Sequence, residues 1–341
     1  MPDTPFSLDD RSVLITGGTG SFGKRFVETV LQRYKPKRLI VFSRDELKQF
    51  EMQSRLSESD HPCLRYFIGD IRDRDRVMRA CAGVDVIVHA AAMKQIPAAE
   101  RNPTECIATN ITGAENLIDA AIDHDVERVV ALSTDKAANP INLYGATKLA
   151  SDKLFVAANN LAGRHRTRFA VVRYGNVIGS RGSVIPLFKR LAAEGRTPLP
   201  ITDPEMTRFV ITLDQGVDFV LQCLHELTGG ELFIPKLPSI KVIDLVPLIA
   251  GDGDYEVVGV RPSEKLHEVM IPLEESRSVI DMGDYYVIPP AYHWWNVSAF
   301  LAKVQRDGKQ VDAQFEYASH TNPTWLDSSE LRALVDSVEA G

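Results

Sequence analysis

The sequence lacks the features that mark several specialised classes of protein. Its four cysteines (Cys63, Cys81, Cys106 and Cys223) have no CxxC spacing, so we expect neither a metal site nor a disulfide framework, and a reducing cytoplasm fits. No apolar run approaches the ~20 residues that a membrane helix requires. Residues 1–10 carry acids and prolines instead of a basic segment followed by an apolar one, so we expect no signal peptide.

An excess of positive charge is also absent. The 46 acidic residues outnumber the 39 lysines and arginines, which leaves a formal net charge of -7. This balance argues against a nucleic acid or an anionic membrane as a partner. What is present is an ordinary globular composition, 44% hydrophobic, in a chain of 341 residues, which is long enough for a cofactor domain and a smaller lobe.

Apolar, β-branched segments alternate with helical segments in the first half of the sequence. We predict strands over residues 12–16, 38–43, 64–68, 84–89, 129–133 and 169–174, and helices over residues 22–34, 46–56, 74–81, 110–124 and 143–161. Continuous apolar strands separated by helices are typical of a parallel sheet that is covered on both faces. The sequence therefore predicts an α/β fold, a Rossmann-type doubly wound parallel sheet over residues 1–180. Residues 181–341 are expected to form mainly a smaller substrate-binding lobe, with some segments returning to the sheet.

A glycine-rich segment follows the first predicted strand. Gly17, Gly20 and Gly23 have GxxGxxG spacing and precede a predicted helix. Glycine allows a tight turn, lets backbone N–H groups approach a pyrophosphate, and lets the helix start close to the strand. The alternative is a glycine-rich turn without a ligand. The position between a buried strand and a helix favours a dinucleotide-binding loop, which also contains Thr19, Ser21 and Phe22.

The end of the second predicted strand carries Ser43, Arg44 and Asp45. NAD enzymes usually place an acid here to bind the ribose 2′-hydroxyl. A hydroxyl and a guanidinium instead suit the 2′-phosphate of NADP, which a carboxylate would repel, and Lys48 one helical turn further adds positive charge. We therefore favour NADP as the cofactor. The alternative is that Arg44 is a solvated turn residue and Asp45 binds NAD.

Two more residues follow strands at positions that suit a dinucleotide. Asp70 follows the third predicted strand, where it can bind the adenine edge, although Asp70 or Asp73 could also be a helix N-cap. Ala90 follows the fourth predicted strand, and its small side chain leaves room for the cofactor, although alanine is also common in ordinary packing.

Tyr144 and Lys148 form a YxxxK pair, which places both side chains on one face of a predicted helix. The pKa of a free tyrosine is about 10, too high for a base at neutral pH. A neighbouring ammonium and a positive nicotinamide ring both favour the phenolate. Such pairs also occur by chance on helix surfaces, but Ser133 and Thr134 at the end of the fifth predicted strand place this pair beside the expected cofactor.

These motifs and the order of the elements resemble the extended short-chain dehydrogenase/reductases. The sequence is most similar to one branch of them, the inverting UDP-N-acetylglucosamine 4,6-dehydratases of the pseudaminic acid pathway. The resemblance extends from about Asp9 to Leu326 and includes the segments SRDELKQFEM, STDKAANPINLYGATK, RYGNVIGSRGSVIP, ITDPEMTRF, KLHEVMIP and FEYASHTNPTWL. It implies an NADP-dependent homo-oligomeric enzyme that acts on UDP-N-acetylglucosamine.

The resemblance also implies the chemistry of the site. Tyr144 takes the proton of the sugar 4-hydroxyl while hydride passes to NADP+, and Lys148 holds the nicotinamide ribose. Lys136 is the acid/base for carbon 5, which the new ketone acidifies, and Asp135 is its partner in the elimination of the 6-hydroxyl, beside Thr134. Hydride then returns to carbon 6, and protonation of carbon 5 from the opposite face inverts it. From the residues alone, Asp135 and Lys136 are equally an ordinary ion pair on a loop.

The resemblance places further residues around the two ligands. The expected substrate residues are Lys94, Asn176, Arg208, Arg261 and Glu264, with the arginines on the diphosphate and Glu264 near the uridine ribose. The alternative for each arginine is a surface ion pair. The remaining expected cofactor residues are Ile71, Lys94, Ser133, Val177 and Arg181.

One position departs from the family pattern. Ser263 stands where the family has glycine. If this position requires a positive φ, serine introduces strain and could shift Glu264.

Two other functions stay open from the sequence. A retaining 4,6-dehydratase or a 4-epimerase would act on a similar nucleotide sugar, although many retaining relatives have methionine where Tyr144 stands. A non-catalytic NADP-binding redox sensor is the second alternative. The presence of Tyr144, Lys148 and the pair Asp135 and Lys136 argues against a sensor.

Overall fold

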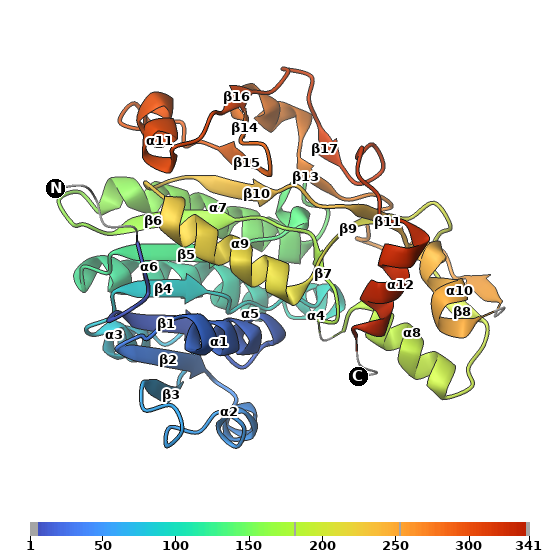
Figure 1. The fold of residues 1–341 in the computed structure, drawn as a ribbon, viewed down its shortest axis with the longest axis horizontal. Helices are drawn as coiled ribbons and strands as arrows, with labels where there is room; N and C mark the ends of the chain where they lie inside the picture. Colours follow the sequence, from blue (N-terminus) through green and yellow to red (C-terminus); the bar gives the residue numbers. More distant parts are fainter. Residues whose placement is uncertain (1–5, 181, 252–253, 339–341) are drawn as a thin grey trace.

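A ten-stranded sheet forms the centre of the computed structural model, which describes residues 6–180, 182–251 and 254–338 (Figure 1). Its strands are β1 (Ser12–Thr16), β2 (Arg38–Ser43), β3 (Leu64–Ile68), β4 (Val86–His89), β5 (Arg128–Leu132), β6 (Arg168–Val172), β10 (Leu232–Pro235), β14 (Ile280–Asp281), β15 (Tyr285–Ile288) and β16 (Lys309–Gln310). Their order is β16-β14-β15-β10-β6-β5-β4-β1-β2-β3. Strands β1 to β6 and β10 are parallel, whereas β14, β15 and β16 add antiparallel pairs at one edge.

Helices cover both faces of the sheet because its inner strands are apolar on both sides. Strands β1 and β4 are buried along their whole length. Helices α1 (Ser21–Arg33) and α9 (Leu213–Glu226) pack against each other on one face, and α3 (Arg74–Cys81), α6 (Gly113–Asp123) and α7 (Leu143–Leu161) form a row on the other (Figure 1). Shorter helices lie at the sheet edges and loops: α2 (Glu46–Gln53), α4 (Ile96–Arg101), α5 (Pro103–Ile107) and α11 (Val297–Val304). Among the described residues, none of the helices is both long and apolar enough to cross a membrane.

The order of the parallel strands determines where ligands are expected to bind. The series β3-β2-β1-β4-β5-β6 reverses direction between β1 and β4. In a doubly wound sheet the crevice at this reversal, outside the carboxyl ends of the strands, is the ligand site. The loops that follow β1, β4, β5 and β6 therefore meet at one edge of the sheet, although they are far apart in the sequence.

A smaller lobe lies beyond this edge and has its own apolar core, which includes Ile185, Phe188, Leu199 and Leu245 (Figure 1). Its elements are β7 (Asn176–Val177), α8 (Val184–Ala193), β8 (Leu199–Ile201), β9 (Thr207–Ile211), β11 (Ser239–Lys241), α10 (Leu245–Ala250), β12 (Tyr255–Val257) and α12 (Ser328–Asp336). The antiparallel pair of β13 (Val269–Ile271) and β17 (Tyr317–Ala318) packs against the main core beside the lobe. The chain between lobe segments returns to the sheet as α9, β10 and β14 to β16. The lobe is thus assembled from separate stretches of the second half of the chain.

Most elements of the first half lie where the sequence pattern predicts them, and two differ in an informative way. The predicted strand 84–89 begins only at Val86, because Gly83 turns the chain at a φ of 66°. The predicted helix 110–124 begins with a π-helix over Ala108–Thr112. In that turn the Asn110 amide accepts the N–H of Met93 (2.8 Å), and donates to the Met93 carbonyl and to the Thr147 hydroxyl (both 3.0 Å). The irregular turn thereby fixes the loop that carries Lys94.

Candidate active site

A cavity of about 1290 Å³ lies between the carboxyl edge of the sheet and the lobe. It collects nearly every residue that the sequence suggested, from loops on both sides. The lining includes Gly17, Thr19, Gly20, Ser21, Phe22, Gly23, Ser43, Arg44, Asp45, Lys48, Asp70, Ile71, Ala90, Lys94, Ser133, Thr134, Lys136, Tyr144, Lys148, Asn176, Val177, Arg208, Arg261 and Glu264. Asp135 is fully buried behind this lining, and Arg181 lies outside the described residues.

The glycine loop is pressed closely against its neighbours. Gly17 has a φ of 64°, and a Cβ on it would lie 2.9 Å from the carbonyl carbon of Ala90 at the end of β4. A Cβ on Gly23 would lie 2.5 Å from the Cα of Gly18, so only glycine lets α1 start this close to the loop. Helix α1 begins at Ser21 and directs its positive end at the cavity. This cradle fits the pyrophosphate of a dinucleotide.

Arg44 and Asp45 have different surroundings at the end of β2. The Asp45 carboxylate caps α2 by accepting the N–H of Lys48 (3.0 Å), and it lies 2.5 Å from the Lys48 ammonium. The Arg44 side chain is 64% exposed and lies 3.8 Å from Asp70. The Asp45 carboxylate is therefore committed to its own helix, while Ser43 and Arg44 offer donors to the cavity.

Asp70 is not a helix cap. Asp73 accepts the Arg76 N–H and caps α3, whereas Asp70 is bonded by Arg72 at 2.7 Å. The hydrogen bond from Arg72 lowers the pKa of Asp70. The carboxylate stays ionised beside the cavity.

Helix α7 presents three buried polar side chains one turn apart, Tyr144, Lys148 and Asp152. Burial lowers the pKa of Lys148, and the charge of Asp152 opposes this shift. The Asp152 carboxylate accepts a hydrogen bond from Ser133 at 2.6 Å and lies 3.9 Å from Arg173. These contacts tie the Lys148 face of the helix to the ends of β5 and β6.

The environment of Tyr144 includes a cation that the YxxxK spacing did not indicate. Burial raises the pKa of Tyr144 to about 12, although the charge of Lys136 and a hydrogen bond with Thr134 lower it. The charge of Lys136 therefore favours the phenolate. The surrounding residues alone do not produce a phenolate, because burial outweighs them.

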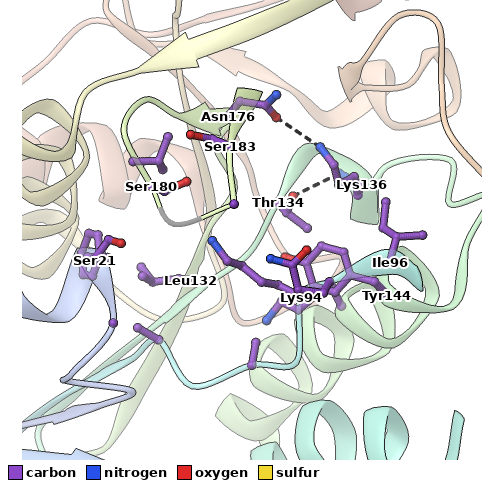
Figure 2. A pocket seen from close by; sticks show the side chains of 18 of the residues that line it. Ser21, Lys94, Ile96, Leu132, Thr134, Lys136, Tyr144, Asn176, Ser180 and Ser183 are labelled. Carbon is purple, nitrogen blue, oxygen red and sulfur yellow. Dashed lines mark hydrogen bonds between the residues drawn. The ribbon is translucent and has the colours of Figure 1, made fainter. Parts of the chain in front are cut away.

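Lys136 lies at the cavity wall in a short 3-10 helix, Asp135–Ala137, and reaches toward Asn176 (Figure 2). Its Nζ lies 3.0 Å from Asp135 Oδ1, 3.1 Å from Glu268 Oε1 and 3.2 Å from Asn176 Oδ1. Burial lowers the pKa of Lys136, but the charges of Asp135 and Glu268 together outweigh it, and the net shift is upward. The balance that the sequence left open is thus resolved in favour of an ammonium.

Asp135 reaches the cavity through its neighbours. Burial and the charge of Glu268 raise its pKa. Its Oδ1 accepts hydrogen bonds from Thr134 (2.8 Å) and Lys136 (3.0 Å), and its Oδ2 is buried without a hydrogen-bond partner among the described residues. Thr134 and Lys136 both line the cavity, whereas Asp135 does not. A proton held by Asp135 would pass to a bound molecule through one of these two side chains.

The expected diphosphate residues lie on the lobe side of the cavity. Arg208 is buried and donates to the carbonyl oxygens of Thr207 (2.7 Å), Leu266 and Lys265 (both 3.0 Å). The Arg261 side chain is 64% exposed and lies 3.8 Å from Glu264. One guanidinium is therefore fixed by the backbone, and the other is largely exposed beside Glu264.

Ser263 has the positive φ that the family's glycine suggested, 68°. A non-glycine residue in this region costs about 1 kcal/mol. The Asn142 amide holds the turn by donating to the Ser263 carbonyl at 3.0 Å. With serine in this strained turn, Glu264 lines the cavity.

Two buried acids of the site were missed by the sequence reasoning. Asp152 lies in the same helix as Tyr144 and Lys148, four residues after the lysine. This spacing of one further helical turn was the signal that could have identified it. Glu268 lies in the segment KLHEVMIP, where an acid among apolar residues indicates a buried charge. Glu268 contacts Lys136 and Arg208, which come from distant parts of the chain, so these contacts could not be predicted from the sequence.

The fold and the site together define the class of protein. A Rossmann-type sheet, a glycine loop at the reversal of strand order and a buried Tyr144 and Lys148 pair are those of the extended short-chain dehydrogenase/reductases. The sequence profile of the polysaccharide biosynthesis protein family matches residues 13–290. The chain is 51% identical over 338 residues to a Campylobacter jejuni protein named UDP-N-acetylglucosamine 4,6-dehydratase (inverting), covering 97% of this chain and 99% of that protein. The chain therefore belongs to the polysaccharide biosynthesis protein family.

Solved structures agree with this placement. The protein Pen from Bacillus thuringiensis has a TM-score of 0.86 and 38% identity, covering 97% of this chain and 98% of its own. A dTDP-glucose 4,6-dehydratase from Streptomyces venezuelae, with NAD and TYD bound, has a TM-score of 0.67 and 25% identity, covering 75% of this chain and 86% of its own. The predicted fold class, the prediction of an enzyme and the resemblance to the inverting dehydratases are confirmed.

Proposed function

We propose that the chain catalyses the NADP-dependent 4,6-dehydration of UDP-N-acetylglucosamine with inversion at carbon 5. The product is UDP-2-acetamido-2,6-dideoxy-β-L-arabino-hexos-4-ulose. The reaction is the first step of pseudaminic acid biosynthesis, carried out by a cytoplasmic homo-oligomer. The observation that carries the proposal is the meeting of Tyr144 and Lys136 in one cavity with the glycine loop, in a chain 51% identical to a protein named for this reaction.

The side chains divide the chemistry between them. Tyr144 accepts the proton of the sugar 4-hydroxyl, and Lys136 removes the proton of carbon 5 once the neighbouring carbon is a ketone. The departing 6-hydroxyl needs a proton, because hydroxide is a poor leaving group. Asp135, once protonated, is the source: it passes its proton to the Thr134 oxygen, 2.8 Å away, while the Thr134 hydroxyl gives its own proton to the leaving group. Arg208 and Arg261 hold the diphosphate, with Glu264 at the uridine ribose.

The residues at the sheet edge fit a nicotinamide dinucleotide. NADP, when bound, supplies reversible hydride transfer, first from carbon 4 and finally to carbon 6. The glycine cradle holds the pyrophosphate, Lys148 holds the nicotinamide ribose, and Ser43 with Arg44 receives the 2′-phosphate. The commitment of Asp45 to its own helix supports NADP over NAD.

Replacing Arg44 by alanine should weaken NADP binding much more than NAD binding. A charge-assisted hydrogen bond contributes about 1.5–3 kcal/mol, so the Kd for NADP should rise roughly tenfold to a hundredfold. Titration calorimetry with both cofactors measures the two changes, and Arg55→Ala, an exposed arginine outside the cavity, is the control. Equal losses for both cofactors would show that Arg44 does not bind the 2′-phosphate.

A proton NMR time course of UDP-N-acetylglucosamine in heavy water tests the proposed function. We expect the 6-hydroxymethyl signals to be replaced by those of a methyl group, deuterium to enter carbon 5, and the L-arabino configuration to appear. Because the hydride is returned, the absorbance of reduced nicotinamide should stay constant during turnover.

Each alternative gives a different spectrum. A retaining dehydratase forms the same methyl group with the original configuration at carbon 5. A 4-epimerase keeps the 6-hydroxyl, and a redox sensor leaves the sugar unchanged. Accumulation of one NADPH per sugar would instead indicate an ordinary dehydrogenase.

A further inference from the structure

Glu268 is the group beside Lys136 that the proposed mechanism does not use. It lies just before β13, is 2% exposed, and its backbone N–H donates to Ser319 Oγ at 2.9 Å. Its Oε1 lies 3.1 Å from Lys136 Nζ and 3.7 Å from Arg208 Nε. Its Oε2 is buried without a hydrogen-bond partner among the described residues. One carboxylate thus joins the proposed carbon-5 base to the proposed diphosphate clamp.

We propose that Glu268 is a positioning residue for the carbon-5 step, which holds Lys136 at the cavity wall and sets the pH range in which Lys136 and Asp135 exchange a proton. This inference rests on the proposed function, because it needs Lys136 to act on carbon 5. It adds a third acid to the pair that the sequence indicated.

The positioning part follows from the contacts. A lysine side chain is long and flexible, and a buried ammonium requires acceptors for its protons. Asp135 after β5, Asn176 in β7 and Glu268 just before β13 each supply one acceptor. Without Glu268, Nζ loses one of these three acceptors, and the opposing negative charge with it. The contact therefore also fixes the segment before β13 against the end of β5 at the reacting position.

The charges around Lys136 give the two neighbouring acids, Glu268 and Asp135, different protonation behaviour. Burial raises the pKa of Glu268, but the positive charges of Lys136 and Arg208 outweigh burial, so the net shift is downward. Burial and the charge of Glu268 raise the pKa of Asp135. Lys94, Tyr144 and Lys265 also face this cluster, and Glu264 lies 3.7 Å from Arg208 Nη2. Glu268 therefore stays ionised, and Asp135 is the acid that can take a proton.

The exchange is a single proton transfer. The Nζ–H bond of Lys136 breaks and an O–H bond forms on Asp135 Oδ1, 3.0 Å away. The ion pair becomes a neutral amine and a neutral carboxyl, and the net charge of the three side chains is unchanged. The products are the free base that carbon 5 needs and the acid that the leaving hydroxyl needs. Glu268 does not react, but its charge keeps the single proton within the pair up to a higher pH.

The test is the pH profile of carbon-5 hydrogen exchange, measured with saturating UDP-N-acetylglucosamine in heavy water for the NADP-loaded enzyme and its Glu268→Gln variant. Loss of a negative charge lowers the pKa of every group that faces it. Both limbs of the profile should therefore move to lower pH, by about one unit or more. Glu268→Asp keeps the charge and should keep the limbs in place while its maximum rate falls. Glu205→Gln, which removes an exposed charge of the lobe, should leave the profile unchanged.

A second measurement needs no turnover. NMR of the enzyme with carbon-13 lysine, in which Lys136→Met identifies the Lys136 signal, gives the titration of Lys136 directly. The Glu268→Gln enzyme should titrate at lower pH than the wild type. The inference would be overturned if the Glu268→Gln variant kept both limbs of the pH profile at their wild-type positions. If that variant is inactive, an unchanged titration of Lys136 would overturn it instead. Absence of exchange in the wild-type enzyme would instead reject the proposed function, so the two failures are distinguishable.

Discussion

Replacement of Tyr144 by phenylalanine should abolish oxidation at carbon 4 while leaving both ligands bound. The substitution removes one hydroxyl from a buried ring and keeps its packing in α7, so the fold should persist. A positioned general base contributes about 10²–10⁴ in rate, and we expect a loss of kcat of about 10³. Rapid-mixing absorbance of reduced nicotinamide in a single turnover measures the first hydride transfer directly.

The result also tests where the chemistry starts. Because oxidation precedes every later step, Tyr144→Phe should lose carbon-5 exchange to the same extent as it loses hydride transfer. Tyr66→Phe, which alters a tyrosine outside the cavity, is the matched control. A variant that still reduced its cofactor at the wild-type rate would remove Tyr144 from the role of base.

The first half of the fold was predictable because its signals are local. Strands such as β1 and β2 are continuous apolar runs, and Gly17 and Gly20 lie between a strand and a helix, with Gly23 in the first turn of that helix. In a doubly wound sheet, topology alone then brings the loop ends to one edge. The cavity residues carried by those loops were therefore accessible from the sequence.

The second half gave weaker signals for a physical reason. Strands β14 and β16 are two residues long, and β10 is four, so no periodicity identifies them. Strand β10 joins the sheet beside β6, and β16 pairs with β14, in both cases across a long stretch of chain, whereas β14 and β15 form a local antiparallel pair. A local pattern contains no information about such a partner.

The charge balance of the site depends on the same distant contacts. The sequence shows Asp135 beside Lys136, and from this pair alone the state of the lysine was open. Glu268, which lies 132 positions further along the chain, approaches within 3.1 Å and tips the balance toward an ammonium. The sequence was sufficient to identify the residues of this pair, whereas their protonation states could be inferred only from the folded structure.

Replacement of Lys136 by methionine should eliminate carbon-5 exchange and retain binding of NADP and UDP-N-acetylglucosamine. Methionine keeps the length and apolar stem of lysine but cannot carry the proton. Exchange of the carbon-5 hydrogen with heavy water should fall by about 10³. Oxidation at carbon 4 precedes this step, so a single turnover should still reduce the bound cofactor and then stop. The reduction should be slower than in the wild type, because the charge of Lys136 no longer favours the Tyr144 phenolate. Lys153→Met, on the exposed side of α7, is the matched control.

The same variant should be less stable in a way that depends on pH. Removal of Lys136 leaves Asp135 and Glu268 buried without the ammonium between them, and loss of one partner of a buried ion pair costs about 3–5 kcal/mol. Without the cation the pKa of Asp135, which burial already raises, rises further. The ionised carboxylate is then unfavourable in the folded state, so the stability lost at high pH should return as pH falls and Asp135 takes up a proton. Thermal unfolding across pH measures this.

These two readouts separate the roles of Lys136. If it is the carbon-5 base, exchange stays absent at low pH even where the fold has regained its stability. If it only neutralises the two acids, exchange should recover together with stability as Asp135 becomes protonated. Exchange at near the wild-type rate would show that Lys136 is not the base. Tyr144, whose ring also lines the cavity, would then be the leading candidate.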